Sequence, residues 1–139
     1  METARLVAFI REHSLGVEAT VVAGGAPQAA VVGLVVNDAL ELFFDTLEST
    51  RKFANLKSNP KIALVIGWDH EQTVQYEGVA DVPTGAGLEA FLALYFARFP
   101  DGPQRRSWPG IQYVRVRPRW IRYSDFRVDP PVIFERGDF

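Results

Sequence analysis

The sequence contains no cysteine. This absence excludes disulfides, thiolate metal sites, iron–sulfur clusters and a cysteine nucleophile. Charge of one sign is not in excess either, because 15 lysines and arginines face 17 acidic residues and give a net charge of −2. A general nucleic-acid binder needs a basic excess to displace phosphate counterions, so we expect no nucleic-acid partner.

Long hydrophobic runs are also missing from the sequence. No stretch approaches the roughly 20 apolar residues of a membrane-spanning helix, and we expect no membrane partner. The residues up to Gly16 do not have the form of a secretory signal, since their apolar stretch, 6–10, is short and is followed by charged residues. We therefore expect a cytoplasmic protein.

The composition is that of an ordinary folded domain. The 139 residues are 47% hydrophobic and 23% charged, which is typical of one globular domain. We treat residues 1–139 as a single domain. Residues 127–139 include the Pro130-Pro131 pair, and we expect them to form a peripheral tail.

Hydrophobic periodicity and turn residues predict a mainly β chain. Strands are expected at 16–23, 28–36, 39–45, 61–68, 73–83, 111–117 and 120–126. Helices are expected at 3–13, 49–58 and 87–99, and a loop at 104–110. Gly78 marks a bulge or a close backbone approach within its strand. Strands joined by turns, with few helices between them, favour a closed or nearly closed antiparallel barrel.

Patterns for nucleophilic or metal chemistry are weak. The two histidines, His13 and His70, lie in stretches that we expect to be exposed, and no G-x-S-x-G motif occurs. We interpret Asp69-His70-Glu71 as a solvated turn, because neighbouring turn residues do not all face one point. We therefore expect no metal site and identify no catalytic residue.

The most informative segment is 43–60, FFDTLESTRKFANLKSNP. A strand ends at Asp45-Thr46, and Arg51 and Lys52 follow at the start of a helix. A helix start offers unpaired backbone N–H groups and a positive dipole end, and Arg can bind phosphate through two hydrogen bonds. This pattern is a candidate cradle for a phosphate monoester. The alternative is a capped surface helix with solvated basic residues, although cations at a helix N-terminus oppose its dipole.

The same segment carries a resemblance to a known family. Its motif is Asp45-Thr46 followed by S-x-R-K-x-x-N-L-x-x-N-P and an apolar strand. It resembles the pyridoxamine 5′-phosphate oxidase-like family of FMN-binding split barrels. The flanking strands, the apolar helix and the closing V-R-V-R-P-R-W-I-R-Y segment stand in the same order as in that family. The resemblance covers roughly residues 5–126, which we take as the core of the domain.

The resemblance implies a six-stranded antiparallel split barrel that forms a homodimer, with FMN at the subunit interface. Arg51 and Lys52 would grip the FMN phosphate, and the backbone of 29–34 would lie against the isoalloxazine ring. The other residues that the resemblance assigns to the cofactor are Phe44, Asp45, Thr46 and Ser49 around the strand end, Lys57 on the helix, and Thr73 or its neighbour Gln72 from the other subunit.

The function that the resemblance implies is an FMN-dependent oxidoreductase of unknown substrate, with hydride or electron transfer at the flavin. The sequence departs from the oxidase proper. It has no R-x-H motif near its C-terminus, and its second strand lacks the Arg and Lys that flank the flavin phosphate there. Vitamin B6 oxidation is therefore not favoured. Three alternatives stay open: a relative that binds deazaflavin or haem in the same cleft, a non-catalytic flavin-binding module, and a barrel that has lost its cofactor.

Overall fold

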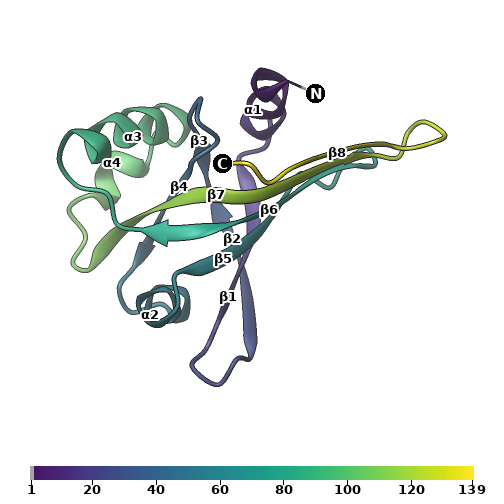
Figure 1. Cartoon of the computed structure of the whole chain (residues 1–139). Helices are drawn as coiled ribbons and strands as arrows, with labels where there is room; N and C mark the ends of the chain where they lie inside the picture. The colour runs from purple at the N-terminus through teal and green to yellow at the C-terminus, as the bar shows by residue number, and fades with distance from the viewer. Residues whose placement is uncertain (1) are drawn as a thin grey trace.

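A strongly curled antiparallel sheet forms the body of the molecule, and helices lie around it (Figure 1). The computed structural model describes residues 2–139. In this range the strands are β1 (Leu15–Val21), β2 (Pro27–Gly33), β3 (Val35–Val36), β4 (Leu42–Leu47), β5 (Lys61–Ile66), β6 (Gln72–Asp81), β7 (Ile111–Asp125) and β8 (Val132–Arg136). The helices are α1 (Thr3–Arg11), α2 (Arg51–Ser58), α3 (Gly85–Arg98) and α4 (Gly102–Arg105).

The order of strands across the sheet is β2-β1-β5-β6-β7-β4-β3, and β8 pairs with β7. The curl brings β2 near β4, although the two strands do not pair, so the barrel is split between them. Helix α2 follows β4 directly and packs on β1. The mainly β fold and the split antiparallel barrel are thereby confirmed.

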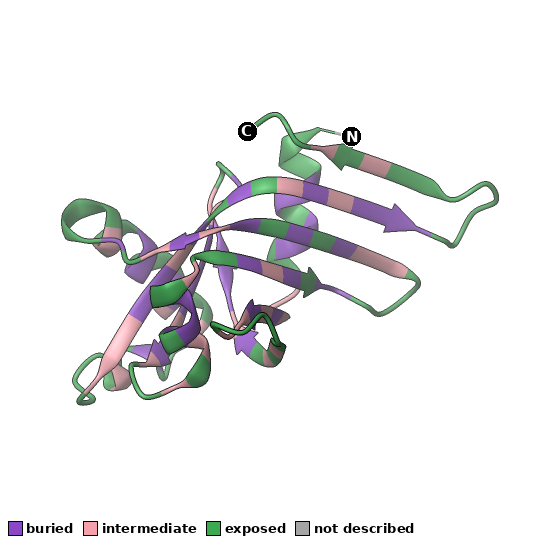
Figure 2. Ribbon diagram, turned by 60° about the horizontal axis from the view of Figure 1, so that its bottom comes forward, coloured by how far each residue is buried: buried purple, intermediate pink, exposed green. Residues whose placement is uncertain are grey.

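Buried and exposed residues alternate along the strands, as Figure 2 shows. This alternation follows from the period of two in a β-strand and places one face of each strand in the barrel interior. The interior is a continuous apolar core whose fully buried members include Leu42, Phe44, Ile66, Val74 and Ile121. Helix α1 contributes Leu6 and Ile10 to the same core.

A second, smaller core lies between the opposite face of β4 and β7 and helix α3. Phe43 is its centre: its ring stacks on Phe91 at 5.0 Å and meets Tyr95 edge-on at 5.4 Å, centroid to centroid. Both faces of β4 are therefore buried, which fits its nearly continuous apolar sequence. Packing on both sides fixes the end of β4, from which α2 begins.

The long strand β7 corrects our expectation of two strands interrupted by Pro118. Residues 111–125 form one strand, and the register against β6 shifts between Glu77 and Gly78. Gly78 pairs with Pro118 and Glu77 with Trp120, so Arg119 is the extra residue of a β-bulge. A bulge accommodates proline because the missing N–H is not needed at a disrupted rung. We expected a bulge or a close backbone approach at Gly78: the bulge lies opposite this glycine, and the carbonyl oxygen of Arg117 approaches it closely.

Other boundaries also differ from expectation. The apolar run 28–36 divides at Leu34 into β2 and β3, and the next strand begins at Leu42 rather than at residue 39. The delay has a local cause, because the side-chain oxygen of Asn37 accepts hydrogen bonds from the backbone N–H groups of Ala39 and Glu41 and holds a turn. The loop expected at 104–110 includes the end of the short helix α4.

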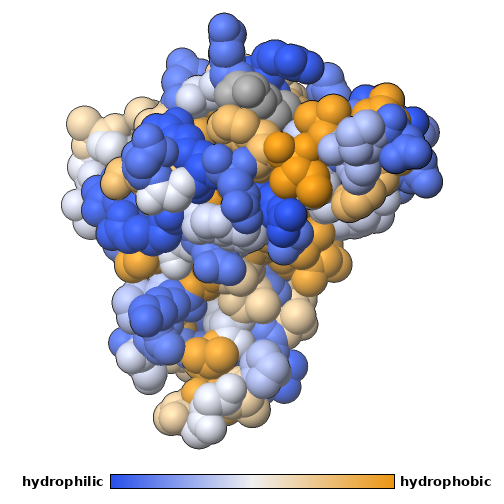
Figure 3. Space-filling model, turned by 45° about the vertical axis from the view of Figure 1, so that its right-hand side comes forward, coloured by the Kyte–Doolittle hydropathy of each residue, from blue (hydrophilic) through white to orange (hydrophobic). Residues whose placement is uncertain are grey.

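The C-terminal segment that we expected to be a peripheral tail contains an ordered strand. β8 pairs with the second half of β7, from Ile121 to Asp125. The two ends of the chain lie close together (Figure 1), and Arg136 donates a hydrogen bond to the hydroxyl of Thr3 at 3.0 Å. Seen from the side of β8, hydrophobic surface is exposed between hydrophilic residues (Figure 3). Val132 and Ile133 of this strand are about half exposed.

The close packing at the bulge leaves no space for a side chain at Gly78. We expect Gly78→Ala to destabilise the fold by about 1–3 kcal/mol. A Cβ atom there would overlap the carbonyl oxygen of Arg117 and lie 2.7 Å from Cγ1 of Val116. Thermal unfolding followed by circular dichroism measures the loss. Gly24→Ala is the matched control, since its Cβ meets no atom within 4 Å, and equal melting temperatures for both variants would contradict this geometry.

Candidate functional site

At the start of helix α2, backbone N–H donors remain available to a ligand. Thr50 is the N-cap, and its hydroxyl accepts a hydrogen bond from the backbone N–H of Phe53 at 3.4 Å. The same hydroxyl shares a hydrogen bond of 2.9 Å with that of Thr46, the buried residue near the end of β4. Within residues 2–139 the backbone N–H groups of Arg51 and Lys52 have no acceptor. They are the unpaired donors that a helix N-terminus presents to an anion.

A small cavity of about 80 Å³ lies beside this helix start. Helix α2 contributes Arg51 and Lys52, and the β1–β2 hairpin supplies the rest of the lining, namely Glu18, Thr20, Gln28, Ala29 and Ala30. Neither Arg51 nor Lys52 forms an ion pair with any residue in the described part of the chain. Two unpaired cations and two free backbone donors therefore border one cavity.

Asn55 fixes the polar side of this cavity. Its side chain is buried, and its amide nitrogen donates to the hydroxyl of Thr20 and to the side-chain oxygen of Gln28, both at 3.0 Å. Thr20 and Gln28 stand opposite each other in the β1–β2 register. One asparagine of α2 thus ties the helix to both strands of the hairpin. This bridge keeps Lys52, one turn earlier on the helix, against the strands.

Glu18 is the unexpected member of the cavity. Its side chain is only 1% exposed, and its Oε2 atom has no hydrogen-bond partner within residues 2–139. Burial raises the pKa of this carboxyl, and the positive charge of Lys52 partly opposes the rise. The sequence analysis overlooked Glu18, Thr20 and Gln28. The signal was the alternation in GVEATVVA, in which the polar Glu18 and Thr20 share one face of a strand.

The residues predicted around the end of β4 lie on different sides of that strand. The side chain of Thr46 faces the helix start, and Ser49 is exposed in the turn that precedes it. Phe44 is fully buried in the barrel core, so it can meet a ligand only through its backbone. Asp45 points the other way: its carboxylate accepts hydrogen bonds from the hydroxyl of Tyr95 at 3.0 Å and from Nε of Arg105 at 2.8 Å.

The remaining predicted residues lie away from the cavity. Lys57, near the C-terminal end of α2, is exposed and places its Nζ 5.5 Å from the centre of the Phe53 ring. Gln72 and Thr73 are the first two residues of β6, and Gly78 lies toward the other end of this strand. Gln72 donates to the hydroxyl of Tyr123 at 2.6 Å, and the buried hydroxyl of Thr73 has no partner among the described residues. The single chain does not bring Gln72 and Thr73 to Arg51 and Lys52.

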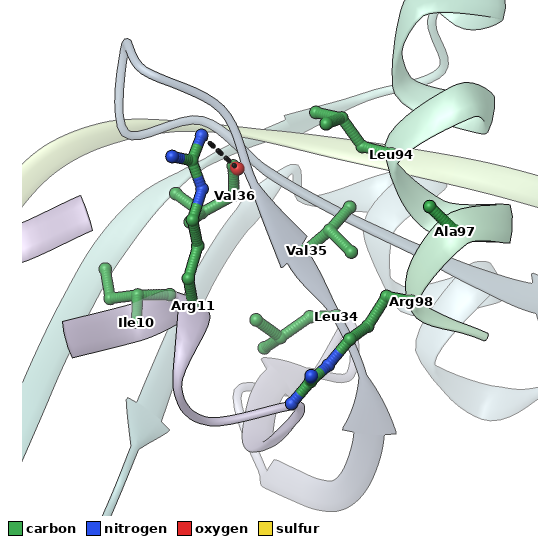
Figure 4. A pocket seen from close by; sticks show the side chains of 8 residues that line it. All are labelled: Ile10, Arg11, Leu34, Val35, Val36, Leu94, Ala97 and Arg98. Atoms are coloured by element: carbon green, nitrogen blue, oxygen red, sulfur yellow. Dashed lines mark hydrogen bonds between the residues drawn. The ribbon is translucent and has the colours of Figure 1, made fainter. Parts of the chain in front are cut away.

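A second pocket, of about 300 Å³, lies between α1, β3 and α3 (Figure 4). Its walls are mostly apolar, and Leu34 and Val35 lie between the two arginines Arg11 and Arg98. Arg11 donates to the carbonyl oxygen of Val36 and pairs with Asp38 at 2.9 Å. Leu34 is the one of these residues that falls in the segment 29–34, which we expected against the isoalloxazine ring. This pocket shares no lining residue with the cavity at the start of α2.

On the outer face of the sheet, strands β2, β1 and β5 carry small apolar side chains. The register aligns Val31, Val17 and Val65 in one row across β2, β1 and β5, and Ala29, Ala19 and Ala63 in the next. Val31 is 61% exposed and Val65 40%. Hollows of about 160 and 640 Å³ lie along this face. We call these two rows the apolar face; exposed apolar surface of this kind marks contact with a partner or ligand.

Among residues 2–139, no group of three or more histidine, aspartate and glutamate side chains is placed to hold a metal ion. No helix in this range combines the length and apolar character needed to cross a membrane.

Comparison with known proteins identifies relatives along nearly the whole chain. The profile of the pyridoxamine 5′-phosphate oxidase family matches residues 3–125. A pyridoxine/pyridoxamine 5′-phosphate oxidase from Cupriavidus metallidurans is 34% identical over 113 residues, which are 78% of this chain and 51% of that protein. The chain thus spans about half the length of the curated relatives it matches.

Solved structures share the fold at lower identity. A haem-binding protein from Mycobacterium smegmatis has a TM-score of 0.84 at 17% identity, covering 99% of this chain and 58% of that one. An FMN-binding protein related to pyridoxamine 5′-phosphate oxidase, from Nostoc punctiforme, has a TM-score of 0.72 at 14% identity, covering 97% and 88%. The split barrel, the basic start of α2 and the match over residues 3–125 agree: this chain belongs to the pyridoxamine 5′-phosphate oxidase family.

Proposed function

We propose that this chain binds FMN through its phosphate at the start of α2 and acts as a flavin-dependent oxidoreductase. The observation that carries the proposal is the pair of cations without ion-pair partners, Arg51 and Lys52, beside two free backbone N–H groups and a small cavity. Cations at a helix N-terminus oppose the helix dipole, so they need a compensating anion. A phosphate monoester supplies that charge and enough oxygen atoms to accept from every free donor.

The residues present fit this group, with fewer charges than the resemblance would suggest. The inward side chains of β2 at the cavity are those of Gln28 and Ala30, so the cations come from α2 alone. Gln28 and Thr20 are already oriented by Asn55. Held in place by the helix and the hairpin, these groups meet an incoming phosphate with little loss of side-chain entropy.

We further propose that the protein is a homodimer whose apolar face lies against the partner. Rows of valine and alanine across three strands form a flat surface that a second copy can cover. In this arrangement Thr73 and Gln72 of one subunit would approach the cofactor bound by the other. This part of the proposal rests on the family resemblance, which assigns a polar residue at the start of this strand to the cofactor of the other subunit.

The chemistry of such a protein resides in its cofactor. Bound FMN would supply hydride or electron transfer, and the chain would hold the phosphate, orient the ring and exclude water. Within residues 2–139 the cavity lining includes no histidine, and Glu18 is its one carboxyl group that could exchange a proton with a substrate. The substrate therefore stays open.

A haem-binding function is the second candidate, because a haem-binding protein shares the fold over nearly the whole chain. Haem in this cleft would need an axial ligand. The ring of His13 lies tilted against that of Phe9, and its Nδ1 atom is 2.8 Å from the carbonyl oxygen of Phe9. His70 lies exposed in a turn. Neither histidine borders the cavity at α2, which favours FMN.

The phosphate cradle is tested by an FMN titration followed by flavin fluorescence. We expect Arg51→Ala and Lys52→Ala each to weaken FMN binding about 10- to 100-fold, because each removes a charge-assisted hydrogen bond worth about 1.5–3 kcal/mol. Riboflavin, which lacks the phosphate, should bind weakly and equally to all three proteins. Arg5→Ala, which removes an exposed charge on α1 away from the cavity, serves as the control. Unchanged FMN affinity in both cradle variants would refute the assignment.

The apolar face is tested by sedimentation velocity. We expect the wild-type chain to sediment as a dimer, and Val31→Asp with Val65→Asp to shift it toward the monomer. A carboxylate on this face would be buried and desolvated in the interface. Both side chains are already well exposed in the single chain, so the fold should survive. Val132→Asp, on the exposed strand β8, should stay dimeric. A wild-type mass of one chain would overturn the dimer.

A further inference from the structure

Anion binding alone does not explain why the acidic residue Glu18 lines the cavity. A buried acidic side chain borders the same cavity as Arg51 and Lys52, where it reduces the positive charge available to a phosphate. Complementary sites place like charges apart, because juxtaposed like charges weaken binding. The position of Glu18 inside the cavity therefore calls for a role.

The strand geometry leaves Glu18 no alternative position. Its backbone pairs with Ala30 of β2 on one side and with Leu64 of β5 on the other, so the side chain is directed inward. The charged residues lining the cavity are Glu18 itself, from β1, and Arg51 and Lys52, from α2. The β2 lining residues are neutral, and its β5 neighbour is leucine. Lys52 is thus the nearest compensating charge, and no ion pair shorter than 4.0 Å joins it to Glu18 in the described chain.

We propose that Glu18 takes up a proton when the phosphate binds and donates a hydrogen bond to it, so that binding is coupled to proton uptake. This inference rests on the proposed FMN function. The proton comes from solvent, and it remains on the carboxyl while the phosphate is bound. Glu18 is a specificity-determining residue of this cradle: it favours an acceptor-rich anion that can receive its hydrogen bond.

Two physical effects act in the same direction. Burial already disfavours the carboxylate and raises its pKa above that of an exposed glutamate. A phosphate dianion beside it would add repulsion and would draw Lys52 to itself, which raises that pKa further. The protonated carboxyl has a donor, and the unpartnered Oε2 shows that no other group in residues 2–139 satisfies that atom.

The pH dependence follows from this difference in pKa. The pKa of Glu18 is higher in the bound state than in the free state. Affinity is therefore full below the free-state value, falls by up to about tenfold per pH unit as pH rises above it, and levels off above the bound-state value. Ionisation of the phosphate itself acts oppositely near pH 6. A variant without the carboxyl separates the two effects.

The first experiment uses the wild-type protein alone. FMN is titrated calorimetrically near pH 7.5 in buffers of different ionisation enthalpy, and the slope gives the number of protons taken up. FMN phosphate is already mostly dianionic at this pH, so uptake reports the protein. We expect uptake of a substantial fraction of one proton per site. Binding without proton uptake at every pH between 6 and 9 would overturn the inference.

The second experiment compares FMN affinity from pH 6 to 9 in three proteins. Glu18→Gln keeps the size and one donor of the side chain, and it should bind FMN without the alkaline loss. Glu48→Gln, an exposed change three residues before Arg51, should retain the wild-type profile. Parallel profiles for wild type and Glu18→Gln would refute the role of Glu18 while leaving FMN binding intact. No FMN binding by any of the proteins would instead overturn the proposed function, and this inference with it.

Discussion

The pairing of β1 on both edges is the constraint on which the site depends. β1 lies between β2 and β5, so its register is fixed by two ladders and its side chains cannot exchange faces. Its inner face carries Glu18 and Thr20 toward α2, and its outer face carries Val17 and Ala19 toward solvent. One strand thereby defines both a polar cavity inside and an apolar face outside. A shift of one residue would destroy both surfaces at once.

The end of β4 is fixed by a different interaction, on the side away from the cavity. The carboxylate of Asp45 joins Arg105 of α4 and Tyr95 of α3, and both side chains of the ion pair are less than 20% exposed. Desolvation by burial, followed by the charge of Asp45, raises the pKa of Tyr95 well above its usual range, so the hydroxyl stays protonated and donates. The strand therefore enters the turn before α2 at a fixed angle. Asp45 thereby positions the helix start through the backbone, and this role is compatible with the place that we propose for FMN.

Sequence reasoning predicted the fold and the family because their signals are local. The helix start at Arg51 and Lys52, the bulge at Gly78 and the strand alternation can each be found within a few residues. β8 was missed because the proline pair Pro130-Pro131 just before it favoured a peripheral tail, although Val132, Ile133 and Phe134 form an apolar run. Glu18 was missed because one acidic residue in an apolar strand signals a site only once the inward face is known. The long strand β7 was divided at Pro118 because the partner that forms the bulge lies about 40 residues earlier in the sequence.

The charges of the cavity explain why its polar residues are divided between two elements. α2 brings the cations and the hairpin brings the acid and the neutral donors, and Asn55 holds the two together through hydrogen bonds to Thr20 and Gln28. If all charges stood on one element, they would neutralise each other at short range and leave nothing for a ligand. Here Glu18 and Lys52 face the same cavity without forming a close ion pair, so each retains an unsatisfied interaction that a phosphate and a proton can complete together. Helix α2, packed on β1 and joined to both strands of the hairpin through Asn55, thus holds its cations near Glu18 without a close ion pair.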